Sequence, residues 1–217
     1  MRRITLSFDN GPDPDVTPLV LDVLHERGLR ASFFVVGDKL QDHKRRAASE
    51  RAHIEGHWIG NHTFHHVVPL GLNPDPDVAA NEIGRTQSLI GKLAHDDRLF
   101  RPFGGGGAIG SHLLSRATLQ HLIDGKYTCV LWNVVPGDWD DADGWVERAL
   151  DQCAKTDWAL VVLHDLPTGA MDHLEHFIDA ASEGGGTFVQ EFPPSCVPLV
   201  RGQIVSPVEA YVADAAV

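Results

Sequence analysis

Short apolar runs rich in β-branched residues alternate with amphipathic stretches along the chain. Residues 4–8 form the first apolar run, and residues 31–36, Ala-Ser-Phe-Phe-Val-Val, form the second. In the stretch between them apolar residues recur at helical spacing, with Thr17 as the expected N-cap, Pro18 at the first helical position and Gly28 at the end. A strand, a helix and a strand in close succession predict a βαβ unit and therefore a parallel sheet.

The same alternation continues through the rest of the sequence. Five further helix candidates are expected at 40–54, 77–94, 110–123, 143–154 and 172–182, and each precedes a short apolar run, at 57–60, 98–100, 127–132, 159–163 and 187–190. About seven such units predict either a (β/α) barrel or a doubly wound sheet, and the pattern alone does not separate the two. No repeat, low-complexity tract or linker divides the sequence, so a single domain over 1–217 is expected.

Composition narrows the functional classes. The 217 residues are 43% hydrophobic, which is enough for a sizeable core. Thirty acidic against eighteen basic residues give a formal net charge of −12, so the basic footprint of a protein that binds nucleic acid or an anionic membrane is missing. The apolar runs are too short to cross a bilayer and the N-terminus has no signal-peptide pattern, so a cytoplasmic protein is expected. Cys129, Cys153 and Cys196 lack metal-binding spacing and are expected to be free, buried thiols.

Polar side chains follow five of the expected strands at or just beyond the point where each ends. They are Asp9, His62, Arg101, Asp138 and His164. The carboxyl ends of parallel strands meet at one edge of the sheet, where ligands bind in such folds. Each residue has an ordinary structural explanation when taken alone, since Asp, Asn, Gly and Pro are the residues that turns prefer. Five of them together predict a functional site.

Two further patterns are weaker signals. His62 and His66 have a spacing that suits metal ligation, but 13 histidines in this chain give about one such pair by chance, and His53 and His57 form a second pair. The position past a strand therefore gives the first pair its weight, and His65 between them is a rival ligand. The glycines at 104–107 are not followed by the Gly-Lys-Ser/Thr of a phosphate-binding loop, so a flexible loop beside the site is expected.

In chain order these pieces resemble the NodB-homology family, the polysaccharide deacetylases of carbohydrate esterase family 4. The counterparts of the family's five motifs are residues 7–12, 62–66, 100–104, 132–139 and 161–165, which span about three-quarters of the chain. The resemblance implies a distorted (β/α) barrel with about seven parallel strands. It also implies a divalent metal at the carboxyl-end face, most often zinc, with cobalt or nickel as alternatives.

The resemblance also implies a role for each matching residue. It assigns catalysis to Asp9, His164, Arg101 and Asp138, metal binding to Asn10, His62 and His66, and the substrate pocket to Phe103, Trp139 and Val162. Asp9 would be the general base, oriented by Arg101. His164, held and tuned by Asp138, would be the general acid that protonates the departing nitrogen. Each such proton transfer is typically worth ~10²–10⁴ in rate, and a bound metal acidifies water and polarises the carbonyl.

The sequence departs from the family pattern at three positions. Asn10 stands where the family has a second aspartate, and a neutral amide oxygen predicts weaker metal binding, with His65 as an alternative ligand. Val135 replaces a second acid of the fourth motif, and Trp58 replaces an acid that often precedes the second. These departures suggest an altered substrate or a changed metal site.

The expected function is metal-dependent removal of acetyl groups from N-acetylated amino sugars or oligosaccharides. Two alternatives stay open. One is an amide hydrolase that opens a small cyclic amide such as a ureide or imide, with or without a metal, and the other is a non-catalytic carbohydrate-binding relative. A small-molecule or oligosaccharide substrate is the expected partner. The tail, residues 188–217, is compatible with completing the barrel, covering a pocket or meeting a partner.

Overall fold

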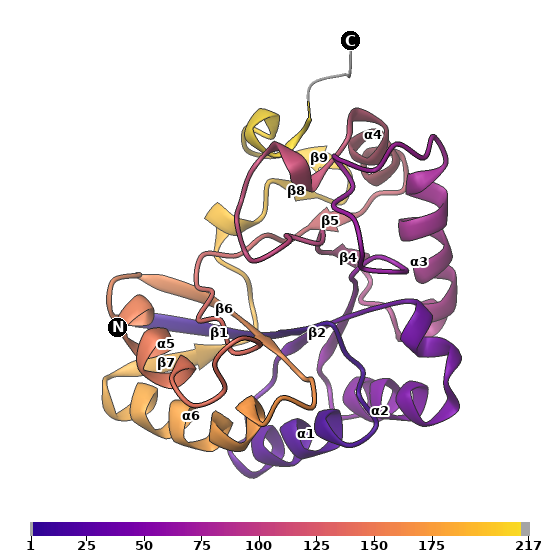
Figure 1. The fold of residues 1–217 in the computed structure, drawn as a ribbon. Coiled ribbons are helices and arrows are strands. Elements are labelled where there is room, and N and C mark those ends of the chain that lie inside the picture. The colour runs from indigo at the N-terminus through magenta and orange to yellow at the C-terminus, as the bar shows by residue number, and fades with distance from the viewer. Residues whose placement is uncertain (1, 214–217) are drawn as a thin grey trace.

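A computed structural model describes residues 2–213, in which nine strands form one curled sheet with helices on its outside (Figure 1). The strands are β1 (Arg2–Asp9), β2 (Ser32–Val35), β3 (Trp58–Asn61), β4 (Leu99–Phe100), β5 (Thr128–Cys129), β6 (Trp158–His164), β7 (Gly186–Val189), β8 (Leu199–Val200) and β9 (Gln203–Ile204). The α-helices are α1 (Val16–Glu26), α2 (His43–Ile54), α3 (Arg85–Ile90), α4 (Arg116–Asp124), α5 (Trp145–Ala154) and α6 (Leu174–Glu183). The alternation of strands and helices expected from the sequence is confirmed.

Strands β1 to β7 pair in parallel, and β1 lies at the centre of the arrangement. It pairs with β6 along most of its length, with β7 near its start and with β2 near its end. The segment directly after β5 forms no further regular strand, but its residue Val134 forms a parallel bridge to Val161 of β6. The Asn133 side chain supports this contact, because it accepts from the Leu160 amide and donates to the Trp158 carbonyl. The bridge joins the segment after β5 back to β6, so the curled sheet forms a ring of strands. This ring is a distorted (β/α) barrel, and the doubly wound alternative is wrong.

Side chains of β1 alternate between two buried environments. Ile4, Leu6 and Phe8 belong to the main hydrophobic cluster, which they share with residues of α1 and α6. Ser7 and Asp9 alternate with them, and both accept a hydrogen bond from the buried side chain of Arg101. The period of two along a strand thus places an acid inside the carboxyl-end opening of the ring.

Helix α1 begins earlier than the sequence suggested, so the expectation that Thr17 caps it is wrong. The N-cap residue is Asp15, and the Asp13 side chain accepts from the amides of Asp15 and Val16. Because Asp13 already serves these first amides, the Thr17 hydroxyl is used elsewhere. It accepts from the Asp13 amide and donates to the carboxylate of Asp165 at the end of β6.

The C-terminal tail continues the sheet. β8 pairs antiparallel with β5 and with β9, and the Leu131 amide donates to the Cys196 carbonyl. Of the three roles considered for 188–217, the described part takes the first, and residues 214–217 lie outside the described residues. The three cysteines are free and buried, as predicted. In the part of the chain that the structure describes, no helix is both long and apolar enough to span a membrane.

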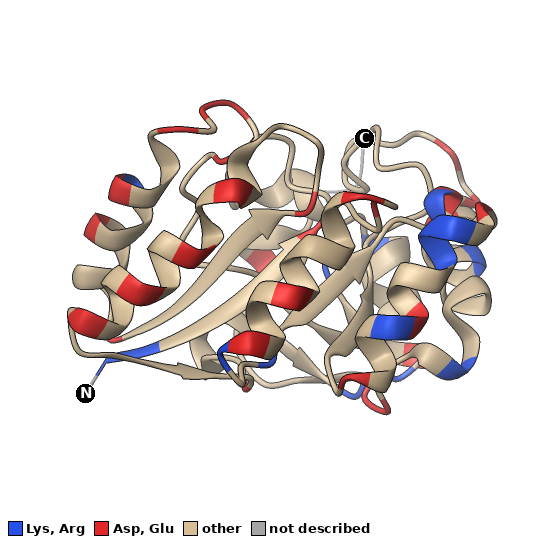
Figure 2. Cartoon of the chain, turned by 90° about the horizontal axis from the view of Figure 1, so that it is seen from below, with Lys and Arg blue, Asp and Glu red and all other residues tan. Residues whose placement is uncertain are grey.

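Charges are unevenly distributed over the outer helices. Figure 2 shows acidic residues along several helices, and four Lys and Arg residues lie on α2. Arg51 of α2 pairs with Asp22 of α1 and with Glu55, while Arg46 pairs with Glu50. Two of the basic residues on α2 therefore form ion pairs with neighbouring acids.

Candidate active site

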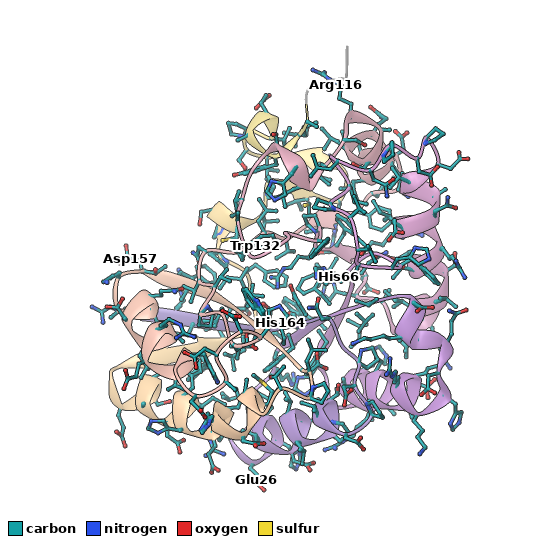
Figure 3. The ribbon with its side chains drawn as sticks, in the orientation of Figure 1. Glu26, His66, Arg116, Trp132, Asp157 and His164 are labelled. Atoms are coloured by element: carbon teal, nitrogen blue, oxygen red, sulfur yellow. The ribbon has the colours of Figure 1, made fainter. Side chains whose placement is uncertain are left out.

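Three of the five strand-end residues, Asp9, His62 and His164, line one cavity of about 170 Å³ at the carboxyl ends of the parallel strands. His66, His164 and Trp132 lie around the centre of the ring (Figure 3). Eight of the ten predicted site residues line this cavity: Asp9, Asn10, His62, His66, Phe103, Trp139, Val162 and His164. The other two, Arg101 and Asp138, lie behind it and are fully buried. The sequence-based prediction that these segments converge is confirmed.

Arg101 fixes the orientation of Asp9. Its Nη1 donates to Asp9 Oδ1 at 2.8 Å and to Ser7 Oγ at 2.7 Å. Its Nε and Nη2 donate to the carbonyls of Val130 and Leu131. The guanidinium is thereby bonded at all three nitrogens despite its complete burial. One carboxylate oxygen of Asp9 is occupied, and the other is left for chemistry in the cavity.

Two imidazoles converge opposite that oxygen. His62 Nδ1 lies 2.8 Å from the carbonyl oxygen of Arg101, which can only accept, so Nδ1 carries the proton and Nε2 presents a lone pair. His62 Nε2 lies 3.1 Å from His66 Nε2 and 3.6 Å from Asp9 Oδ2. Two nitrogens bound to one tetrahedral zinc ion lie about 3.3 Å apart. Burial lowers the pKa of both histidines to about 3, so both are neutral at neutral pH and able to bind a metal.

Asn10 supplies a third donor beside them. It adopts a left-handed conformation, with φ 69°, that asparagine tolerates better than most residues, and its side chain lines the cavity. Its Oδ1 is buried without a hydrogen-bond partner, which is the condition expected of an atom that binds an ion. Within residues 2–213, no group of three or more His, Cys, Asp or Glu is placed to hold a metal. The chemistry of the donors nevertheless fits a metal, because two neutral imidazole nitrogens and one unpartnered amide oxygen line the same cavity.

His65 does not line the cavity. Its Nδ1 lies 2.6 Å from the carboxylate of Glu82, and about half of its side chain is exposed. The structure gives no support to His65 as a replacement ligand.

His164 lies across the cavity and is held by Asp138 at two points. The Asp138 carboxylate accepts from His164 Nδ1 at 2.9 Å and from the His164 amide at 2.8 Å. Burial by itself lowers the pKa of His164, but the hydrogen bond and charge of Asp138, with the charges of Asp9 and Asp165, outweigh it and raise the pKa. His164 therefore holds a proton more readily than an ordinary imidazole.

The walls of the cavity are largely apolar. Trp139 makes an edge contact with the His164 ring, and Phe103 lies against the His66 ring. Sequence reasoning missed Trp132, whose Nε1 donates to the Gly107 carbonyl and whose ring leaves no room for a side chain at Gly104. Its place within the fourth motif was the available signal. The glycine loop lies beside the site, as predicted.

Asp165, next to His164, contacts both the loop after β1 and the start of α1. A Cβ at Gly11 would overlap its carboxylate, so a larger residue there would have to displace this buried side chain. Burial raises the pKa of Asp165 to about 7. The hydroxyl of Thr17 donates to the same carboxylate, which ties the start of α1 to the end of β6.

Comparison with known proteins relates this chain to polysaccharide deacetylases. Residues 1–121 match the polysaccharide deacetylase family. A peptidoglycan-N-acetylglucosamine deacetylase of Bacillus cereus is 32% identical over 166 residues, which cover 75% of this chain and 72% of that protein. A chitooligosaccharide deacetylase of Rhizobium leguminosarum bv. trifolii is 34% identical over 168 residues, with coverage of 76% and 72%. A peptidoglycan-N-acetylmuramic acid deacetylase of Bacillus subtilis is 31% identical, but this chain covers 36% of its length.

Solved structures agree in fold. A family 4 acetyl xylan esterase from Clostridium thermocellum, in complex with a cobalt ion, has a TM-score of 0.71 at 26% identity and matches over 87% of this chain and 88% of its own. A peptidoglycan N-acetylglucosamine deacetylase bound to an N-oxidanyl-benzamide also has a TM-score of 0.71, at 29% identity, over 92% and 89% of the two chains.

Proposed function

Because the chain belongs to the polysaccharide deacetylase family, we propose that it hydrolyses the acetamide group of N-acetylated amino sugars or oligosaccharides with a bound divalent metal. The observation that carries the proposal is the convergence of the His62 and His66 Nε2 atoms, 3.1 Å apart, beside the carboxylate of Asp9. His164, bonded to Asp138, faces the same cavity. A base and an acid thus line the same cavity.

The residues divide the work of amide hydrolysis between them. A divalent cation held by the two imidazoles and Asn10 would acidify water and polarise the acetamide carbonyl. Asp9 takes the proton of the attacking water through Oδ2, because Oδ1 is held by Arg101. His164 then gives a proton to the departing amine nitrogen, a step without which the amine is a poor leaving group. Trp139 and Val162 form an apolar wall that suits the acetyl methyl group.

The ligand chemistry favours zinc, cobalt or nickel over magnesium or calcium. Imidazole nitrogens suit the first group of metals, whereas the second prefers oxygen ligands. Asn10 adds a neutral oxygen, so the ligand set carries no negative charge of its own. We therefore propose zinc as the metal, bound more weakly than by a set with an aspartate at position 10.

Metal content tests this proposal. Purified protein loaded with Zn²⁺ or Co²⁺ is expected to hold about one equivalent and to deacetylate chitooligosaccharides. His62→Ala is expected to lose both the metal and the activity, because it removes one of the two nitrogen ligands. His53→Ala is the matched control, since His53 belongs to the second pair with the same spacing and is exposed.

Absence of metal under both loading conditions would refute the metal-dependent function. Hydrolysis of a small cyclic amide by such metal-free protein would support the first alternative, an amide hydrolase. Sugar binding without turnover, unchanged in Asp9→Asn, would support the second alternative, a binding relative.

The pH dependence of activity reports on His164. Its protonated form is the proposed acid, so kcat/KM falls as the pH rises through its raised pKa. Asp138→Asn removes the adjacent negative charge and is expected to move this alkaline limb to lower pH by about one to three units. Asp143→Asn, which changes an exposed acid near the solvent-facing His173, is expected to leave the limb in place. A limb that does not move in Asp138→Asn would contradict the assignment of His164 as the acid.

A further inference from the structure

The loop that carries the two histidines is held in a strained conformation. Thr63 and His66 both have positive φ, 67° and 55°, and neither is a glycine. Such conformations are unfavourable for residues other than glycine and persist where surrounding contacts impose them. The bonds that hold this loop therefore determine where the imidazoles of His62 and His66 lie.

Hydrogen bonds to Asn61 and to the backbone of residues 37 and 38 hold the part of the loop that directly follows His62. The Thr63 amide donates to Asn61 Oδ1, and the Thr63 and Phe64 carbonyls accept from the amides of Gly37 and Asp38. These contacts hold the segment directly after His62. The bond to the Phe64 carbonyl also fixes the peptide group between Phe64 and His65, which leads to His66.

The opposite side of the Phe64–His65 segment is bonded to one carboxylate from another part of the chain. Glu82 Oε2 accepts from the amides of Phe64 and His65, both at 2.9 Å, and Glu82 Oε1 lies 2.6 Å from His65 Nδ1. Three donors thus converge on a side chain that is 11% exposed. Hydrogen bonds to an ionised acceptor are about twice as strong as those between neutral groups.

Glu82 reaches the loop from an irregular helical turn. Residues Ala79–Gly84 form a π-helical turn ahead of α3. Such turns are rare in proteins overall, and those that occur are often at functional sites. Asn61, at the end of β3, donates to the Ile83 carbonyl of the same turn. The turn therefore contacts the loop at both of its ends, just before His62 and just before His66.

We propose that Glu82 is a positioning residue for the metal ligands. Its carboxylate fixes residues 64 and 65, and this fixes the direction from which His66 enters the cavity. Because the ligand set is neutral and contains the weak donor Asn10, metal affinity depends on how well the two imidazoles are held in advance. This inference rests on the proposed metal-dependent function.

Three substitutions separate the position of the carboxylate from its charge. Glu82→Ala removes all three bonds, and Glu82→Asp keeps the charge but withdraws it by one methylene from the two amides. Glu82→Gln loses the charge but keeps an oxygen at the same reach. Glu55→Ala is the matched control, because Glu55 is a partly buried, ion-paired glutamate at the end of α2.

Two readouts are needed. The first is Co²⁺ affinity from the visible absorption of the bound ion, and the second is amide hydrogen exchange at Phe64 and His65 in metal-free protein. Glu82→Ala is expected to weaken Co²⁺ binding about 10–100-fold, the usual effect of losing a residue that orients metal ligands, and to speed exchange at both amides. Glu82→Asp is expected to change both readouts in the same direction and serves if the alanine variant does not fold. Glu82→Gln is expected to preserve most of the affinity.

Each other outcome overturns a distinct statement. Unchanged affinity and exchange in Glu82→Ala, or equal losses in Glu82→Gln and Glu82→Ala, would overturn the positioning role. An equal loss of affinity in Glu55→Ala would assign the effect to general destabilisation. Wild-type protein that binds no Co²⁺ would refute the proposed function, and the exchange comparison would still decide whether Glu82 fixes the loop.

Discussion

Asp9→Asn is expected to lower kcat/KM for an N-acetylated oligosaccharide by about 10²–10⁴, the usual contribution of a positioned general base. The carboxamide oxygen of asparagine still accepts the bond from Arg101, so the side chain stays in place. A carboxamide does not take up a proton at neutral pH, so the attacking water loses its base. Steady-state kinetics on chitooligosaccharides, with metal content measured on the same sample, checks this prediction.

The control for this substitution is Asp15→Asn. Asp15 is an acid at the N-cap of α1 whose side chain makes no capping hydrogen bond, and it does not line the cavity. It is expected to leave kcat/KM unchanged. Retention of activity by Asp9→Asn, with the metal still bound, would remove Asp9 from the role of base and require another group to accept the proton.

Arg101→Met is expected to lower the free energy of unfolding by about 3–5 kcal/mol, the usual cost of breaking a buried ion pair by removing one partner. Arg101 is fully buried and donates to Asp9, Ser7 and two carbonyls, so its loss leaves the Asp9 charge and three other acceptors without a donor. Urea denaturation of the variant and the wild type measures the difference.

Two further variants locate the cause of that loss. Arg201→Ala removes an exposed arginine that pairs with Asp97, and such surface pairs are worth about 0–1 kcal/mol. Adding Asp9→Asn to Arg101→Met removes the uncompensated charge and is expected to restore part of the stability. A loss in Arg101→Met no larger than that in Arg201→Ala would show that the buried pair is not an important contributor to stability.

Much of the site could be predicted because its signals are local in the sequence. Apolar runs mark the strands, and the polar residue that follows each run lies at the carboxyl edge whatever the details of the fold. Asp9, His62 and His164 were found in this way. The left-handed Asn10 and its unpartnered oxygen, by contrast, are visible only in three dimensions, although its departure from the family pattern was apparent.

Other features depended on contacts between residues far apart in the chain. Thr17 looked like a helix cap, but the tertiary structure brings it to Asp165, 148 residues away. The N-cap residue is Asp15, and the Asp13 side chain accepts from the first amides of the helix. The strand expected at 127–132 is regular over Thr128–Cys129, because the following segment turns to meet β6 through the side chain of Asn133. Local propensity does not encode either contact.

Glu82 shows this difference most clearly. In the sequence it is one acid of an ordinary helical stretch, and its spacing from the histidines suggests no role. A π-helical turn places its carboxylate under the amides of Phe64 and His65. The sequence by itself determined the parallel β/α order and the chemical types of the strand-end residues, since both follow from local patterns. The tertiary structure alone decided which distant groups hold those residues in place, because that depends on how the loops pack against one another.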